Sequence, residues 1–114
     1  KTGIQSMQIK PSEEAEQETE HPVVRTHPET GRKALYLNPV YTVRFKDMTA
    51  RESKPLLEYL QAHAVREQNT CRFRWARGSV ALWDNRCTQH LALNDYDGQR
   101  REMQRTTIAG GRPR

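Results

Sequence analysis

Residues 83–105 read WDNRCTQHLALNDYDGQRREMQR, and the rest of the chain is best interpreted outward from this stretch. It contains a single histidine, His90, followed by Arg101 and Arg105. A neutral imidazole is a common metal ligand, and a guanidinium is a fixed fork that binds carboxylates or sulfonates through two hydrogen bonds. A lone histidine can equally be a hydrogen-bonded side chain beside a turn, and most arginines are simply exposed. The residues alone therefore leave open a metal- and anion-binding segment or a polar surface segment.

The two arginines have the spacing of one face of a strand. A strand between Gln99 and Ile108 would place Arg101 and Arg105 on the same side, because side chains alternate along an extended chain. At about 3.3 Å per residue they would lie roughly 13 Å apart, which suits two anions or the two ends of one pocket. Burying unpaired cations is costly, so we expect something anionic to meet them.

The polar turn that precedes the histidine has a structural interpretation. Asp84 and Asn85 are typical turn residues, and we expect their side chains to fix the loop carrying His90 through hydrogen bonds to the backbone. Trp83 is expected in the core rather than as a platform for substrate, since indole rings are usually buried.

Two separated blocks carry a resemblance to a known family. The order WDNR-x-x-x-H, ten further residues, Arg, a second Arg four positions on and a closing T-x-x-G resembles the C-terminal signature of the TauD/TfdA family. The segment HPVVRTHPETGRKALYLNP, residues 21–39, resembles a second block of that family. The likeness indicates a polar connector over residues 1–20 and the C-terminal part of a TauD-like dioxygenase domain over residues 21–114.

The resemblance implies a function and a role for each residue. The family consists of Fe(II)- and 2-oxoglutarate-dependent dioxygenases, which use O₂ to hydroxylate small anionic substrates such as taurine, other sulfonates or alkyl sulfates. By this likeness His90 is the distal iron ligand, Arg101 binds the distal carboxylate of 2-oxoglutarate, and Arg105 meets the anionic group of the substrate. The implied fold is a double-stranded β-helix, or jelly roll, with mainly antiparallel strands.

The chain departs from the family in one respect, because it contains no H-x-D motif for the other two iron ligands. His27-Pro28-Glu29 has H-x-E spacing, but it lies in the block that follows the metal motif in the family, so we do not expect it to replace the missing pair. We therefore expect a C-terminal fragment that binds iron poorly by itself. The alternative is a catalytically incomplete remnant that serves as a binding or oligomerisation module, and the sequence leaves a homo-oligomer open.

The amino-acid composition limits the classes of protein to which this chain can belong. The 114 residues are 34% hydrophobic and 29% charged, which supports at most one domain with a small core. The net charge of +5 is compatible with a nucleic-acid module, but the basic residues are scattered, so we expect no nucleic-acid partner. No apolar run approaches a membrane span. The cysteines Cys71 and Cys87 do not form a CxxC pair, so no zinc knuckle is expected and reduced cytoplasmic thiols are the default.

Local patterns predict a mostly antiparallel sheet with one packed helix. Thr49 and Glu52 fit a capping box that opens a helix ending near Ala64. Prolines and alternating side chains predict extended segments and strands. The expected extended or strand segments are 21–25, 33–37, 41–45, 71–75, 79–83 and 99–108, with turns at 27–31 and 76–78 and a short helical piece near 12–19.

Overall fold

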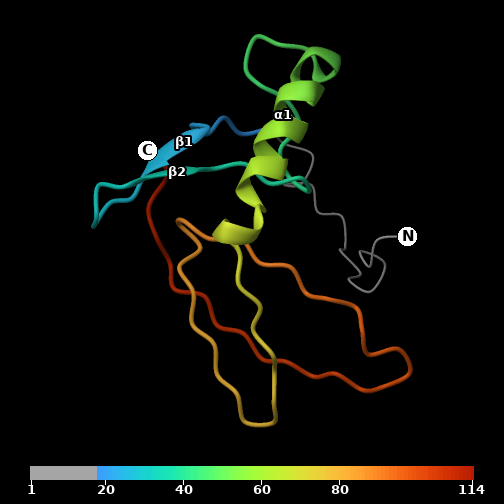
Figure 1. Cartoon of the computed structure of the whole chain (residues 1–114). Helices are drawn as coiled ribbons and strands as arrows, with labels where there is room; N and C mark the ends of the chain where they lie inside the picture. The colour runs from blue at the N-terminus through green and yellow to red at the C-terminus, as the bar shows by residue number, and fades with distance from the viewer. Residues whose placement is uncertain (1–17) are drawn as a thin grey trace. The chain divides into compact units, whose positions relative to one another are not determined.

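The structure is a computed structural model that describes residues 18–114. In chain order the elements are strand β1 (Val24–Thr26), strand β2 (Lys33–Leu35), helix α1 (Ala50–Ala64) and the short 3₁₀ helix η3 (Glu67–Asn69). Figure 1 labels the two strands and α1. The helical piece expected near residues 12–19 falls largely outside the described residues.

The chain divides into two compact units. Residues 20–89 and 113–114 belong to one unit, which contains every helix and strand of the described chain. Residues 90–112 belong to the other unit, where Gly98 takes a φ of 74° and the amide of Gln99 donates to the carbonyl of Tyr96 at 2.9 Å. A positive φ suits glycine because it lacks a Cβ, and it allows a tight turn at this point.

Strands β1 and β2 form an antiparallel hairpin in the register Val24↔Leu35, Arg25↔Ala34 and Thr26↔Lys33. The connecting turn closes because the amide of His27 donates to the carbonyl of Arg32 at 2.8 Å. Gly31, at a φ of 71°, lets the chain reverse. The predicted turn and the start of the second strand are confirmed, and the segment predicted to be extended over residues 21–25 is a strand from Val24 onward.

Helix α1 begins at the predicted capping box. The Thr49 side chain accepts the amide of Glu52 at 3.2 Å, and the Glu52 carboxylate accepts the amide of Thr49 at 2.8 Å. Ser53 is fully buried on this helix, and its Oγ accepts the amide of Phe45 at 3.0 Å. These contacts satisfy backbone donors that the helix cannot pair internally, and they attach the preceding loop to the helix.

The apolar core of the described chain is small, as the composition predicts. Its buried hydrophobic residues are Leu37 and Leu57. Arg25 and His27 are also buried, and the Arg25 guanidinium lies 5.0 Å from the centroid of the Tyr36 ring. Buried polar groups need partners to offset desolvation, so the side chains of this hairpin are informative about its role.

Four predicted strands were wrong, because residues 41–45, 71–75, 79–83 and 99–108 have no strand assignment. In the first segment, the amides of Tyr41 and Thr42 donate to the carbonyl of Asn38, which makes a turn instead. In the second, the rings of Phe73 and Trp75 pack edge to face, with their centroids 4.9 Å apart. These alternating side chains therefore lie on the same side of the chain, as predicted, although the segment is not a strand. Alternation describes an extended chain, whereas a strand also needs ladder hydrogen bonds. The two strands and one helix are compatible with part of a jelly roll, and the described residues do not form a complete one.

The predicted turn at residues 76–78 is confirmed. The amide of Ser79 donates to the carbonyl of Ala76 at 3.0 Å, and Gly78 has a φ of 83°. Of the helices in the described range, none is long and apolar enough to cross a membrane.

Candidate functional site

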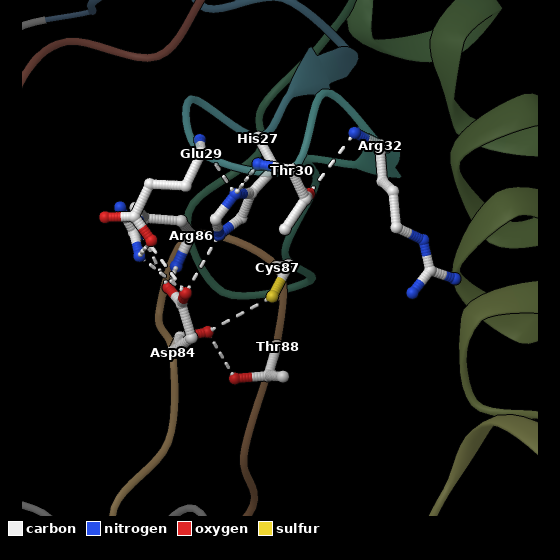
Figure 2. Close-up of polar contacts among 8 residues, drawn as sticks. All are labelled: His27, Glu29, Thr30, Arg32, Asp84, Arg86, Cys87 and Thr88. Carbon is white, nitrogen blue, oxygen red and sulfur yellow. Dashed lines mark hydrogen bonds and ion pairs between the residues drawn. The ribbon is translucent and has the colours of Figure 1, made fainter.

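A buried histidine, His27, occupies the turn of the hairpin and uses both ring nitrogens. Its Nδ1 accepts the backbone amides of Glu29 and Thr30, each at 3.2 Å. Its Nε2 lies 2.9 Å from Oδ2 of Asp84 (Figure 2). An amide N–H can only donate, so Nδ1 must carry the lone pair and the ring proton must reside on Nε2. His27 is therefore held as a neutral Nε2–H donor to the Asp84 carboxylate.

The Asp84 carboxylate is saturated with donors. Besides His27, it accepts the Arg86 amide at 2.9 Å and the Arg86 guanidinium at 2.9 Å on each oxygen. The hydrogen bonds from the Arg86 side chain, followed by the one from His27, hold the pKa of the Asp84 carboxyl well below its usual range. The carboxylate therefore favours its ionised form, in which it accepts from both Arg86 and His27.

Arg86 completes the cluster with a second carboxylate. Its Nη2 lies 3.3 Å from Oε2 of Glu29, and the pKa of the Arg86 guanidinium is raised by the hydrogen bonds to Asp84 and Glu29. Glu29 is mostly exposed, so the ion pair with Glu29 is screened by water and contributes little to stability. The short distances to Asp84 and the buried imidazole make His27 and Asp84 the central pair of this network.

The turn after Asp84 is closed by its own carbonyl. That oxygen accepts the amides of Cys87 and Thr88 at 3.2 and 3.0 Å and the Thr88 hydroxyl at 2.6 Å. At the end of the turn, the side-chain amide of Gln89 donates to the carbonyl of Leu37 at 2.5 Å. The segment that leads into His90 is thus fixed both at its first residue and at its last.

The expected turn role of Asp84 is confirmed by its bond to the Arg86 amide. Asn85 acts differently from the prediction, because its Oδ1 accepts the indole Nε1–H of Trp83 at 2.8 Å. Trp83 is 37% exposed, so the prediction that its ring lies in the core was wrong for the described chain. The hydrogen bond from Nε1 to Asn85 orients the indole of Trp83, whose ring is partly open to solvent.

His27, Asp84 and Cys87 together have the ligand types of a metal site, with candidate ligand atoms within 4.8 Å of one another. Their hydrogen bonding does not fit a metal. Metal binding through Nε2 would require the proton to move to Nδ1, where it would face two amide donors. The Arg86 guanidinium already occupies both oxygens of Asp84 and would repel a cation. The trio is better described as a structural hydrogen-bond cluster.

The three site residues predicted from the sequence belong to the unit containing residues 90–112. His90 is exposed, and within the described range no group of three metal-binding side chains includes it. The Arg101 guanidinium lies 5.3 Å from the centroid of the Tyr96 ring. Arg105 is exposed and is not in a strand, so the predicted shared strand face of the two arginines is not formed.

The segment that contains His90, Arg101 and Arg105 matches a known protein family. The family description "Taurine catabolism dioxygenase TauD, TfdA family" matches residues 2–107, which include His90, Arg101 and Arg105. The chain belongs to the TauD/TfdA family. This agrees with the resemblance carried by its two sequence blocks.

Curated relatives of this TauD/TfdA chain have related names. The chain is 49% identical over 96 residues to an alpha-ketoglutarate-dependent sulfate ester dioxygenase of Pseudomonas putida, covering 84% of this chain and 32% of the relative. It is 47% identical over 93 residues to an alkylsulfatase of Acinetobacter baylyi, covering 82% and 29%. An alpha-ketoglutarate-dependent dioxygenase of Penicillium expansum is 42% identical over 98 residues, covering 84% and 26%. The chain thus spans a third or less of the length of these relatives.

Sequence reasoning missed the role of His27 in this TauD/TfdA chain. The H-x-E spacing drew attention only to metal binding, which was not expected there, and it indicated no other role for His27. In the structure, the backbone amide of Glu29 donates to the His27 ring. The partner Asp84 is 57 positions away, a separation at which no local pattern operates. The available signal was that the two family blocks each contain a polar turn, and the structure brings those turns together.

Proposed function

We propose that this chain is the C-terminal, cofactor-binding part of an Fe(II)- and 2-oxoglutarate-dependent dioxygenase that hydroxylates a small anionic substrate. The observation that carries the proposal is the WDNR-x-x-x-H segment followed by Arg101 and Arg105, within the stretch that matches the TauD/TfdA family. In this proposal residues 1–20 are a connector, and residues 21–114 complete a mainly antiparallel jelly roll whose other strands belong to the rest of the enzyme.

His90 is proposed as one iron ligand, with the other two supplied by an H-x-D motif elsewhere in the complete protein. An imidazole suits Fe(II), and a facial set of two histidines and one carboxylate leaves positions for 2-oxoglutarate and O₂. When bound, the iron supplies the activation of O₂ that couples oxidation of 2-oxoglutarate to hydroxylation of a C–H bond. The contribution of this chain is to provide and orient an imidazole nitrogen.

Arg101 is proposed to bind the distal carboxylate of 2-oxoglutarate. Its contact with the face of Tyr96 limits the directions that the guanidinium can take, while the N–H groups at its edge remain suited to a carboxylate. A guanidinium binds a carboxylate through two parallel hydrogen bonds and so fixes its orientation as well as its charge.

Arg105 is proposed to bind the anionic group of the substrate. Within the part of the chain that the structure describes, it makes no ion pair with a carboxylate. A sulfate or sulfonate presents several oxygens that a guanidinium can bind in pairs. O₂ and this small anion are the expected partners, and the proposal includes neither a nucleic acid nor a membrane.

A sulfate ester is the substrate class that we favour over taurine. The relatives at 49% and 47% identity are named for sulfate esters and alkyl sulfates. Hydroxylation of the carbon that bears the sulfate gives an unstable product that breaks down to an aldehyde and sulfate. The same reaction beside a sulfonate would give an aldehyde and sulfite.

The test is an assay of the complete protein with Fe(II), 2-oxoglutarate and O₂. We expect succinate to form in the presence of a short alkyl sulfate, together with one aldehyde per succinate, and with a higher kcat/KM than for taurine. A preference for taurine would retain the dioxygenase and change the substrate. If neither substrate supported turnover and the protein did not bind Fe(II), the alternative, a binding or oligomerisation module, would be favoured.

A further inference from the structure

We propose that His27 is a positioning residue for the iron site: as a fixed Nε2–H donor it anchors Asp84, and thereby the turn of residues 84–89 that leads into His90. The inference rests on the proposed function for the role of His90. The hydrogen bonds that carry it are all within residues 20–89 and are independent of that role.

The surroundings of the His27 ring fix its tautomer. Two backbone amides point at Nδ1 of His27, both at 3.2 Å, and they come from Glu29 and Thr30 in the hairpin turn itself. The ring is buried, with 8% of its side-chain surface exposed, so water does not compete for these positions. The backbone of one family block therefore determines that Nε2 carries the proton.

His27 links the β1–β2 hairpin to the turn that begins at Asp84. Arg86 makes more hydrogen bonds to Asp84 than His27 does, but it lies only two residues further along the same turn. Its bonds shape the turn without attaching it to another element. The other attachment through Arg86 goes to Glu29, whose side chain is 72% exposed. His27 is the buried donor that ties Asp84 to the hairpin.

The turn that begins at Asp84 connects it to His90 along the chain. The Asp84 carbonyl closes the turn by accepting the amides of Cys87 and Thr88, and Gln89 is attached to the carbonyl of Leu37. Gln89 directly precedes His90 in the sequence. A metal ligand must be held to within a fraction of an ångström, so loss of the anchor at Asp84 should weaken iron binding even though His90 itself is unchanged.

Two substitutions separate the two functions of the ring. Glutamine extends an N–H₂ group to about the distance of Nε2, so His27→Gln keeps a donor to Asp84 and loses the Nδ1 acceptor. Asparagine places its amide oxygen near the position of Nδ1, so His27→Asn keeps the acceptor for the Glu29 and Thr30 amides and loses the donor. Each variant retains one half of the network and serves as the control for the other.

The experiment measures Fe(II) affinity of the complete protein by anaerobic calorimetry, with circular dichroism to confirm folding. We expect His27→Asn to weaken Fe(II) binding by about 10-fold, at the lower end of the effect of residues that orient metal ligands. The glutamine variant should remain within about twofold of wild type, because it rescues the donor to Asp84. Equal affinities of the two folded variants would overturn the proposal.

A second measurement does not depend on the folding of a variant. In ¹⁵N NMR spectra of the wild-type protein, the His27 ring should carry its proton on Nε2 and leave Nδ1 unprotonated. A proton on Nδ1, on either the neutral ring or the imidazolium, would overturn the proposal. Failure of the proposed function would look different, because then His90→Ala would leave Fe(II) binding unchanged while the His27 tautomer remained as described.

Discussion

Nε2 of His27 lies 2.9 Å from Oδ2 of Asp84, although the two residues are 57 positions apart in the chain. This contact joins the segment of residues 21–39 to the WDNR turn, the two stretches that carry the family signature (Figure 2). The two motifs are therefore one structural feature: the hairpin provides a fixed donor, and the turn provides the carboxylate that receives it.

The Asp84 carboxylate should make the stability of the protein depend on pH in acid. Because its folded-state pKa is lowered from the ordinary value of 3.8, its contribution is fully present above that value and is lost progressively as the pH falls from there toward the much lower folded-state pKa. Asp84→Asn should lower the unfolding midpoint at pH 7, and the difference from wild type should begin to shrink below about pH 5 and continue to shrink below about pH 3. Thermal unfolding across this range is the measurement, and a constant difference would contradict the assignment.

The capping box of α1 should contribute measurably to stability. Thr49→Ala removes the acceptor for the amide of Glu52, and loss of such a cap typically costs about 1 kcal/mol. Thr49→Ser keeps a hydroxyl in the same place and should be close to wild type. Urea denaturation of both variants provides the comparison, and equal destabilisation by alanine and serine would show that the hydroxyl is not the stabilising group.

Ser53 should be more sensitive to substitution than a less buried serine with the same type of bond. Ser53→Ala leaves the Phe45 amide without its buried acceptor, which should cost about 1–3 kcal/mol. Ser79 also accepts a backbone amide, that of Ala76, but Ser79 is only half-buried and its bond is exposed, so water can replace the hydroxyl. Ser79→Ala should therefore cost less than Ser53→Ala in urea denaturation, and the reverse order would contradict this view of the helix.

The two proposed anion-binding arginines should affect different substrates. Lysine keeps the charge but loses the fork, so Arg101→Lys should mainly raise the KM for 2-oxoglutarate and Arg105→Lys mainly that for the sulfate ester. Loss of a charge-assisted hydrogen bond corresponds to roughly a 10- to 100-fold change. Arg100, which pairs with Glu102, provides a neighbouring control. The measurement is steady-state kinetics in which the concentration of each ligand is varied in turn. A reversed pattern would mean that Arg101 binds the sulfate ester and Arg105 binds 2-oxoglutarate. If neither KM changed, neither arginine would bind the ligand assigned to it.

Helix α1 was predictable from the sequence because its signals are local. Thr49, Glu52 and the apolar spacing that includes Leu57 lie within a few turns of one another and do not depend on distant residues. The hairpin was predictable for the same reason, since Gly31 allows the reversal between two short extended segments.

The remaining strands and the hydrogen-bond cluster were not predictable in this way. Side-chain alternation at Phe73 and Trp75 indicates extended backbone, but a strand is defined by hydrogen bonds to a neighbouring segment, which alternation does not specify. The tautomer of His27 depends on two backbone amides and one remote carboxylate. Family resemblance supplied the roles of His90 and the two arginines, and these stay predictions.

The most direct test of the proposed function is the iron content of the complete protein with His90 replaced. We predict that His90→Ala reduces Fe(II) binding from one equivalent to a negligible level in anaerobic calorimetry, because two ligands hold the metal far less tightly than three. His63→Ala is the matched control, since that histidine is exposed on α1 and should bind iron as wild type does. Full iron occupancy in folded His90→Ala would contradict the assignment of His90 as a ligand.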